Sequence, residues 1–98
     1  MKLLNEKYIK YLEALGNQER MKMLELLAEK EMSVQEVNKH FFAAQPTISY
    51  HLSQLKDIGF LRSEKRGKFM YYSLATDHIK KYLKGFVKDF SFSLSRIR

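Results

Sequence analysis

The sequence of 98 residues contains no cysteine and no tryptophan, and it has one proline and four glycines. Without cysteine there are no disulfides, thiolate metal sites or thiol redox switches. No apolar run approaches the roughly 18 residues of a membrane span, and the "KLL" near the start is too short for the core of a signal peptide. These absences predict a cytoplasmic protein with no membrane partner.

Linkers, internal repeats and low-complexity segments are also lacking, which predicts one domain over residues 1–98. A chain of this length buries only about 60–65% of the surface that it exposes when unfolded. A monomer would be marginally stable, so a partner subunit is expected.

Negative charge is scarce: eleven Asp and Glu stand against eighteen Lys and Arg, giving a net charge of +7. Such an excess favours a polyanionic partner, either a nucleic acid or an anionic membrane surface. Charge alone leaves both open.

Apolar residues at helical spacing predict five helices, and residue types at their ends support the boundaries. Asn17 is a good N-cap, Ser33 and Glu36 have capping-box spacing, and Pro46 suits a first helical turn. The expected helices cover residues 3–15, 17–30, 33–40 and 45–58, and a last one is capped by Thr76 or Asp77 and weakens after Phe90.

Two β-prone runs, "FLRSEK" and "KFMYYSL", flank Gly67 and predict a hairpin. The fold class expected is therefore mainly α with a small β-hairpin (α+β), in the order of four helices, two strands and one helix. A short helix, a tight "FFAA" turn and a second helix form a helix-turn-helix, and the hairpin at 62–72 suits the wing of a winged helix-turn-helix.

The helix over residues 45–58 carries an unusual uncharged polar face. Ile48, Leu52 and Leu55 share its apolar face, and hydroxyls, amides and a tyrosine point elsewhere: Thr47, Ser49, Tyr50, Ser53 and Gln54. The second helix of a helix-turn-helix enters the major groove, where amides such as Gln45 and Gln54 pair with adenine and Tyr50 contacts a phosphate or a thymine methyl. The alternative is that these are ordinary uncharged surface residues.

The predicted wing carries four basic residues around Gly67: Arg62, Lys65, Arg66 and Lys68. Their position directly after the helix that reads DNA suits contacts with phosphates or with the minor groove. A solvated basic loop is the alternative.

In the stretches "ALGNQERMKMLELL", "QPTISYHLSQLKDIGFL" and "RGKFMYYSL" the chain resembles the ArsR-type winged-helix repressors of bacteria, over nearly its whole length. The resemblance implies a homodimer formed by the first and last helices. It also implies repression of transcription from a roughly palindromic operator on double-stranded DNA, in the bacterial cytoplasm at the nucleoid.

The resemblance also assigns residues. Those expected at DNA are Gln45, Thr47, Ser49, Tyr50, His51, Arg66 and Lys68, besides Gln54. Those expected in the dimer interface are Leu4, Tyr8, Tyr11, Leu12, Ile79, Tyr82, Leu83, Phe86 and Phe90. His51 borders the apolar face and either packs or contacts DNA. Ala44 stands where the family commonly has Ser, so the usual side-chain N-cap is missing.

No metal site or cofactor is expected. Metal-sensing relatives use cysteines or several Asp and His ligands, whereas the last helix offers only Asp77, His78 and Asp89. The methionines suit core packing better than copper binding. Whether an effector exists, such as a small organic ligand among the interface aromatics, stays open.

Two other classes of function are possible from the sequence. A protein-interaction module that has lost DNA binding is the main alternative, because the aromatic stripe of the last helix and its "FSFSLS" tail suit a docking surface. An enzyme is not expected, since the histidines have no nucleophile or carboxylate grouped with them and no glycine loop can cradle a phosphate.

Overall fold

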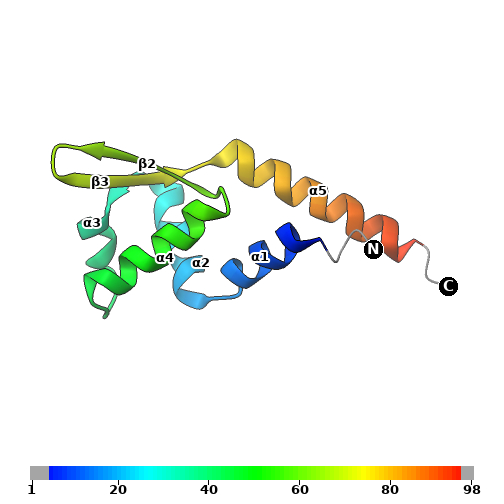
Figure 1. The fold of residues 1–98 in the computed structure, drawn as a ribbon, viewed down its shortest axis with the longest axis horizontal. Coiled ribbons are helices and arrows are strands. Elements are labelled where there is room, and N and C mark those ends of the chain that lie inside the picture. The colour runs from blue at the N-terminus through cyan, green and yellow to red at the C-terminus, as the bar shows by residue number, and fades with distance from the viewer. Residues whose placement is uncertain (1–4, 96–98) are drawn as a thin grey trace.

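The computed structural model describes residues 5–95 and has the predicted fold class, mainly helical with a small antiparallel hairpin (Figure 1). The elements are α1 (Glu6–Leu15), α2 (Gln18–Glu29), β1 (Met32–Ser33), α3 (Val34–Asn38), α4 (Gln45–Asp57), β2 (Leu61–Arg66), β3 (Phe69–Leu74) and α5 (Thr76–Leu94).

A three-stranded antiparallel sheet has the order β1-β3-β2. The hairpin of β2 and β3 turns at Gly67, whose φ of 62° suits a residue without a side chain. The edge strand β1 was not predicted, because a strand of two residues shows no periodicity. It matters for the wing, since Ser33 pairs with Tyr71 and so attaches β3 to the start of α3.

The core lies between α2, α3, α4 and the sheet. Its largest fully buried side chains are Phe60, Met23, Ile48, Leu52, Leu55 and Val37. Three of these come from α4, which confirms the apolar face predicted for that helix. Because α4 packs against α2, α3 and β2, the core fixes the rotation of α4 about its own axis.

On α2 the predicted apolar face is partly wrong. The helical spacing of apolar residues in 17–30 predicts a face through Met21, Leu24, Leu27 and Ala28, yet Met21 is 44% exposed and Ala28 is exposed. Met23 is fully buried instead, with Leu27 one turn later. The reason is that α2 packs against both α4 and β3, and Met23 and Leu27 lie in the core that these elements form.

Helices α1 and α5 lie together on the other side of the molecule, which measures 54 × 25 × 21 Å (Figure 1). Helix α5 has no buried residue along its 19 positions. We call α1 with α5 the arm, and the rest of the described chain the head.

Three helix ends in the arm differ from those predicted: the start of α1 and both ends of α5. Asn5 caps α1 by accepting a hydrogen bond from the Lys7 amide at 2.8 Å, so α1 begins at Glu6 rather than residue 3. Neither Thr76 nor Asp77 caps α5. The N-cap is Ala75, whose amide donates to the Phe60 carbonyl at 2.9 Å and fixes the start of the helix. Helix α5 then continues past Phe90 to Leu94.

Within residues 5–95 no helix is both long and apolar enough to cross a membrane.

Candidate nucleic-acid interface

Hydrogen bonds hold α3 and the turn that joins it to the start of α4. The capping box of α3 is complete, because the Glu36 amide donates to Ser33 Oγ at 3.1 Å and the Ser33 amide donates to Glu36 Oε1 at 3.0 Å. The Ser33 bonds hold the pKa of Glu36 below its usual value. Asn38 Nδ2 then donates to the Ala43 carbonyl at 2.9 Å and closes the turn. This places the first turn of α4 by a hydrogen-bonded frame.

The N-cap of α4 is Ala44, which makes no side-chain cap hydrogen bond, as its residue type predicts. Gln45 and Thr47 do not replace it in the structure. Pro46 occupies the first turn, where a missing amide hydrogen is harmless. The Thr47 and Ile48 amides donate to the Ala44 carbonyl at 3.0 and 3.3 Å, so backbone bonds alone close this end of α4, without a capping side chain.

The outer face of α4 carries most of the residues predicted to read DNA. Gln45, Thr47 and Tyr50 are exposed, Tyr50 by 56%, and Ser49 is half-buried. Ser53 Oγ donates to the Tyr50 carbonyl at 2.8 Å, so its hydroxyl is turned back onto its own helix. The structure therefore brings together a compact uncharged surface at the N-terminal half of α4.

His51 lies on the flank of α4 that faces α2. Its Nδ1 accepts a hydrogen bond from Arg20 Nε at 3.1 Å, and its Nε2 lies 3.1 Å from Glu19 Oε2. The side chain is only 12% exposed. Of the two alternatives for His51, this geometry supports packing, because both ring nitrogens already have partners within the protein.

Gln54 is separated from the other predicted reading residues. It is half-buried and lines a hollow of about 340 Å³ together with Lys10, Glu13 and Arg20. Its side chain thus faces α1 and α2, whereas Tyr50 and Gln45 lie on exposed surface about one and about two and a half turns earlier.

The basic residues of the wing differ in whether the protein itself pairs their charge. Arg62, Lys65 and Lys68 are exposed, and Lys68 Nζ lies 5.6 Å from the centre of the Phe69 ring. Arg66 is also exposed, its side chain by 41%, but its guanidinium is paired: Nη1 and Nη2 donate to the two carboxylate oxygens of Glu31 at 2.7 and 3.0 Å. Nη2 also donates to Glu64 at 2.9 Å.

The Arg66 guanidinium also lies 4.6 Å from the centre of the Tyr71 ring on β3. Arg66 on β2 therefore reaches across β3 to Glu31, the residue just before β1. Its hydrogen bonds lower the pKa of Glu31, and the two carboxylates raise the pKa of Arg66. A bidentate pair of this kind positions both partners more firmly than a single surface contact.

The residues predicted to form the dimer interface line the arm, except Leu4, which lies outside the described residues. Tyr8 Oη donates to Asp89 Oδ2 at 2.6 Å, which raises the pKa of Tyr8. Tyr11 is buried between Phe60 and Tyr82, with ring centres 5.5 and 4.6 Å away. Burial, followed by a hydrogen bond with Tyr82, raises the pKa of Tyr11.

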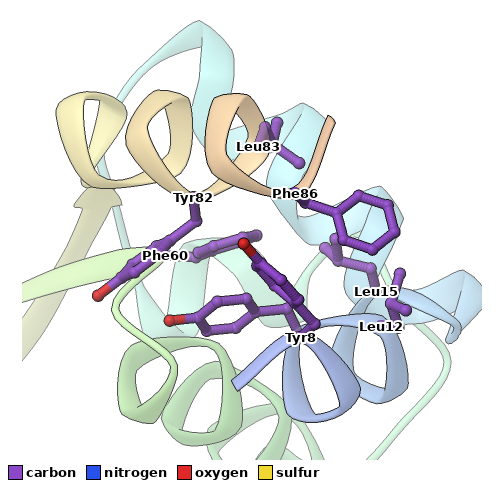
Figure 2. Close-up of a pocket in the computed structure, with 8 residues that line it drawn as sticks. Tyr8, Leu12, Leu15, Phe60, Tyr82, Leu83 and Phe86 are labelled. Carbon is purple, nitrogen blue, oxygen red and sulfur yellow. The ribbon is translucent and has the colours of Figure 1, made fainter. Parts of the chain in front are cut away.

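Figure 2 shows a small apolar pocket between α1 and α5 of about 30 Å³, lined by Tyr8, Leu12, Leu15, Phe60, Tyr82, Leu83 and Phe86, and by Tyr11. The arm also exposes large apolar side chains: Ile9, Leu12, Leu83, Val87, Phe90, Phe92 and Leu94. Ile79 is half-buried. The predicted interface residues thus divide into an aromatic cluster inside the protomer and an apolar surface outside it.

Sequence reasoning missed the partners of two predicted residues. Arg20 and Glu19 hold His51, and Glu31 holds Arg66 across 35 positions of sequence. No local pattern reveals such a pairing, because it depends on strand β1 and on the packing of α2. Phe42, read only as part of an apolar turn, is fully exposed.

Residues 17–63 match the family described as "Bacterial regulatory protein, arsR family". The chain is 36% identical over 63 residues to the transcriptional repressor SdpR of Bacillus subtilis, covering 64% of this chain and 70% of that protein. It is 35% identical over 80 residues to the HTH-type transcriptional regulator MJ1325 of Methanocaldococcus jannaschii, covering 81% and 90%.

Among solved structures, HlyU from Vibrio cholerae has a TM-score of 0.71 at 24% identity, over 93% of this chain and 99% of that one. A possible transcriptional regulator for arsenical resistance has a TM-score of 0.72 at 30% identity, over 81% of each chain.

Proposed function

The chain belongs to the ArsR family of bacterial regulatory proteins, and from this premise and the geometry of α4 we propose that it is a homodimeric repressor that reads an inverted-repeat operator. It is a transcriptional regulator of that family. In the proposed complex the N-terminal half of α4 lies in the major groove, and the wing lies on the flanking backbone or minor groove.

One observation carries the proposal: α4 buries its apolar face completely and exposes an uncharged polar face at the end that a helix-turn-helix turns toward DNA. Gln45, Thr47, Ser49 and Tyr50 are the proposed reading residues. Amides and hydroxyls can pair with base edges, and the Tyr50 ring can contact a thymine methyl. The hydrogen bonds of the turn before α4 hold the backbone that carries these residues in place without DNA, which lowers the conformational entropy lost on binding.

In the proposed complex, His51 and Gln54 orient α4 and do not contact the bases. His51 positions α4 against α2 through Arg20 and Glu19. Gln54 lies too far onto the α1 side to share the surface of Gln45. Replacement of either is expected to act on DNA affinity indirectly, through the orientation of α4.

On the wing we propose Lys68 as the main phosphate contact, with Lys65 and Arg62 beside it. Arg66 instead fixes the wing to the head, because its guanidinium is occupied by Glu31 and Glu64 and rests on Tyr71. Phosphate contacts provide affinity for any sequence and make it depend on salt.

In the proposed dimer, which forms through the arm, the second protomer supplies another α4 to read the second half-site of the operator. Two α4 helices related by a twofold axis would enter successive major grooves about 34 Å apart, which requires an operator with matching symmetry. The apolar side chains that α5 leaves exposed support this contact, since a second copy would remove them from water. Bound over a promoter, such a dimer would block transcription.

The test is selection of bound sequences from a random duplex library at physiological salt, with sedimentation to measure the oligomer. An enriched inverted repeat bound by a dimer is expected. No enrichment by a folded dimer would contradict the proposal and favour a protein-interaction module.

Two variants then separate reading from anchoring. Tyr50→Ala is expected to cost about 1–3 kcal/mol of binding free energy on the selected operator, and little on random DNA. Lys68→Ala is expected to weaken all duplexes and to lower the slope of log affinity against log salt by about one. Lys88→Ala on α5 is the matched control for loss of a lysine. Equal effects of both head variants on random DNA would contradict the assignment.

A further inference from the structure

Phe42 is the most exposed large apolar side chain of the described residues, with an exposed fraction of 112%. A phenylalanine in water forgoes the stabilisation that burial of its ring would give. The function proposed so far uses the turn that carries Phe42 only to place α4.

The turn holds Phe42 outward by fixing its neighbours inward. Phe41 and Ala43, on either side, pack against the core. Asn38 donates to the Ala43 carbonyl at 2.9 Å, and Lys22 Nζ donates to the His40 carbonyl at 2.9 Å while lying 4.8 Å from the centre of the Phe41 ring. With both neighbours held, the Phe42 ring has no route into the core.

The position of Phe42 is at the DNA end of α4. It precedes Gln45, the first residue of that helix, by three positions, and Ala44 between them is exposed and has only a methyl side chain. The ring and the Gln45 amide therefore belong to one end of the helix-turn-helix, the end that meets base edges when the motif docks.

We propose that Phe42 contacts the 5-methyl group of a thymine at the edge of the major groove, and so helps to determine which operator is bound. This rests on the proposed function. The thymine methyl is the one apolar group that a base pair presents in the major groove, and apolar side chains, phenylalanine among them, are suited to it. A ring without charge displaces no counterion, so the contact adds sequence preference without salt dependence.

The surroundings of Phe42 favour a small apolar partner over a protein surface. The hollow beside it, of about 340 Å³, is lined by Phe41, by Phe42 itself and by four polar side chains: Gln18, Glu19, Lys22 and His40. Most of the other exposed large apolar side chains lie on the arm. A protein interface needs an apolar patch at its centre, whereas one thymine methyl needs one ring.

The experiment measures wild type and Phe42→Ala on the selected operator made with thymine or with uracil, which lacks only the methyl group. Phe42→Ala is expected to bind the thymine operator about tenfold more weakly, within the range of one base contact, with an unchanged salt slope. Replacing thymine by uracil is expected to weaken wild type more than Phe42→Ala. Single uracil substitutions should locate the methyl at one position per half-site.

Phe42→Leu is the matched control, since it keeps an apolar side chain and is expected to retain most of the preference for thymine. Both variants alter an exposed residue, so their unfolding midpoints should equal that of wild type. If Phe42→Ala binds the thymine operator like wild type, or weakens thymine and uracil operators equally, only this inference is overturned. If wild type selects no sequence at all, the proposed function fails and this inference fails with it.

Discussion

The head and the arm use apolar side chains in opposite ways. In the head, α4 buries Ile48, Leu52 and Leu55 completely and presents polar groups outward. In the arm, α5 buries none of its residues and presents Leu83, Val87 and Phe90 to the surface. The head therefore has its hydrophobic core within one chain, whereas the arm has an aromatic cluster on one side and an apolar surface that a single chain leaves uncovered.

The proposed homodimeric reader of DNA has two different structural requirements. A reading helix must be held rigidly by its own protomer, because its side chains are to meet base edges in a fixed geometry. A dimerising helix must keep its apolar surface available for a second copy. Substitutions of similar size in the two regions should therefore have effects of different kinds.

Removal of core volume from the head should have the largest effect. Leu52→Ala is expected to lower the free energy of unfolding by about 2–5 kcal/mol, because Leu52 has no exposed surface and its loss leaves a cavity. Urea denaturation measures it. Leu83→Ala is the matched change on the arm. Its effect on the free energy of unfolding should depend on protein concentration, because it concerns the association of two chains. Equal, concentration-independent losses for both would remove the distinction.

A charge on the outer side of the arm should act on assembly alone. Val87→Glu is expected to raise the dimer dissociation constant at least about tenfold, since a carboxylate buried without a partner is unfavourable. The side chain of Val87 is 60% exposed in the protomer, so the fold of each chain should persist. Sedimentation over a concentration series measures dissociation. As a control, Lys81→Glu places a carboxylate on another side of α5 and should leave the dimer intact. If Val87→Glu dimerises like wild type, the interface lies elsewhere.

The uncapped start of α4 offers a stabilising change in the head. Ala44 already has the extended backbone of an N-cap, with φ −69° and ψ 147°, so Ser at this position could accept a hydrogen bond from a first-turn amide. Ala44→Ser is expected to raise the free energy of unfolding by about 1 kcal/mol. Thermal unfolding beside Ala28→Ser, an exposed control position in the last turn of α2, checks it. No gain would mean that the turn leaves the hydroxyl out of reach.

The smallest expected effect concerns the wing. Glu31→Gln with Glu64→Gln releases Arg66, and the slope of log affinity against log salt on random DNA should rise by up to about one. Glu29→Gln controls for the loss of negative charge alone. The same bridge should weaken in acid: because its pKa is lowered in the fold, Glu31 contributes stability above its usual pKa and loses it as pH falls through the lowered value. A double variant with an unchanged slope would show that Arg66 is not withheld from phosphate.

Local rules explain why much of the fold could be predicted. The Asn17 cap, the Ser33 and Glu36 capping box, the missing cap at Ala44 and the hairpin at Gly67 are all confirmed, because each depends on residues close in sequence. Errors arose where distant segments decide. The start of α5 is set by the Phe60 carbonyl, and the buried face of α2 is set by its contact with β3.

The same division holds for the site. The sequence by itself determined the family, the order of the five helices and the two hairpin strands, and the polar face of α4, since these follow from periodicity and from motifs within a few turns of chain. Only the tertiary structure decided which of those residues are available: it engaged His51 with α2, joined Arg66 to Glu31, turned Gln54 toward α1 and left Phe42 exposed. The physical reason is that availability depends on side chains brought close by packing, and a periodic pattern along the chain carries no information about which partners these are.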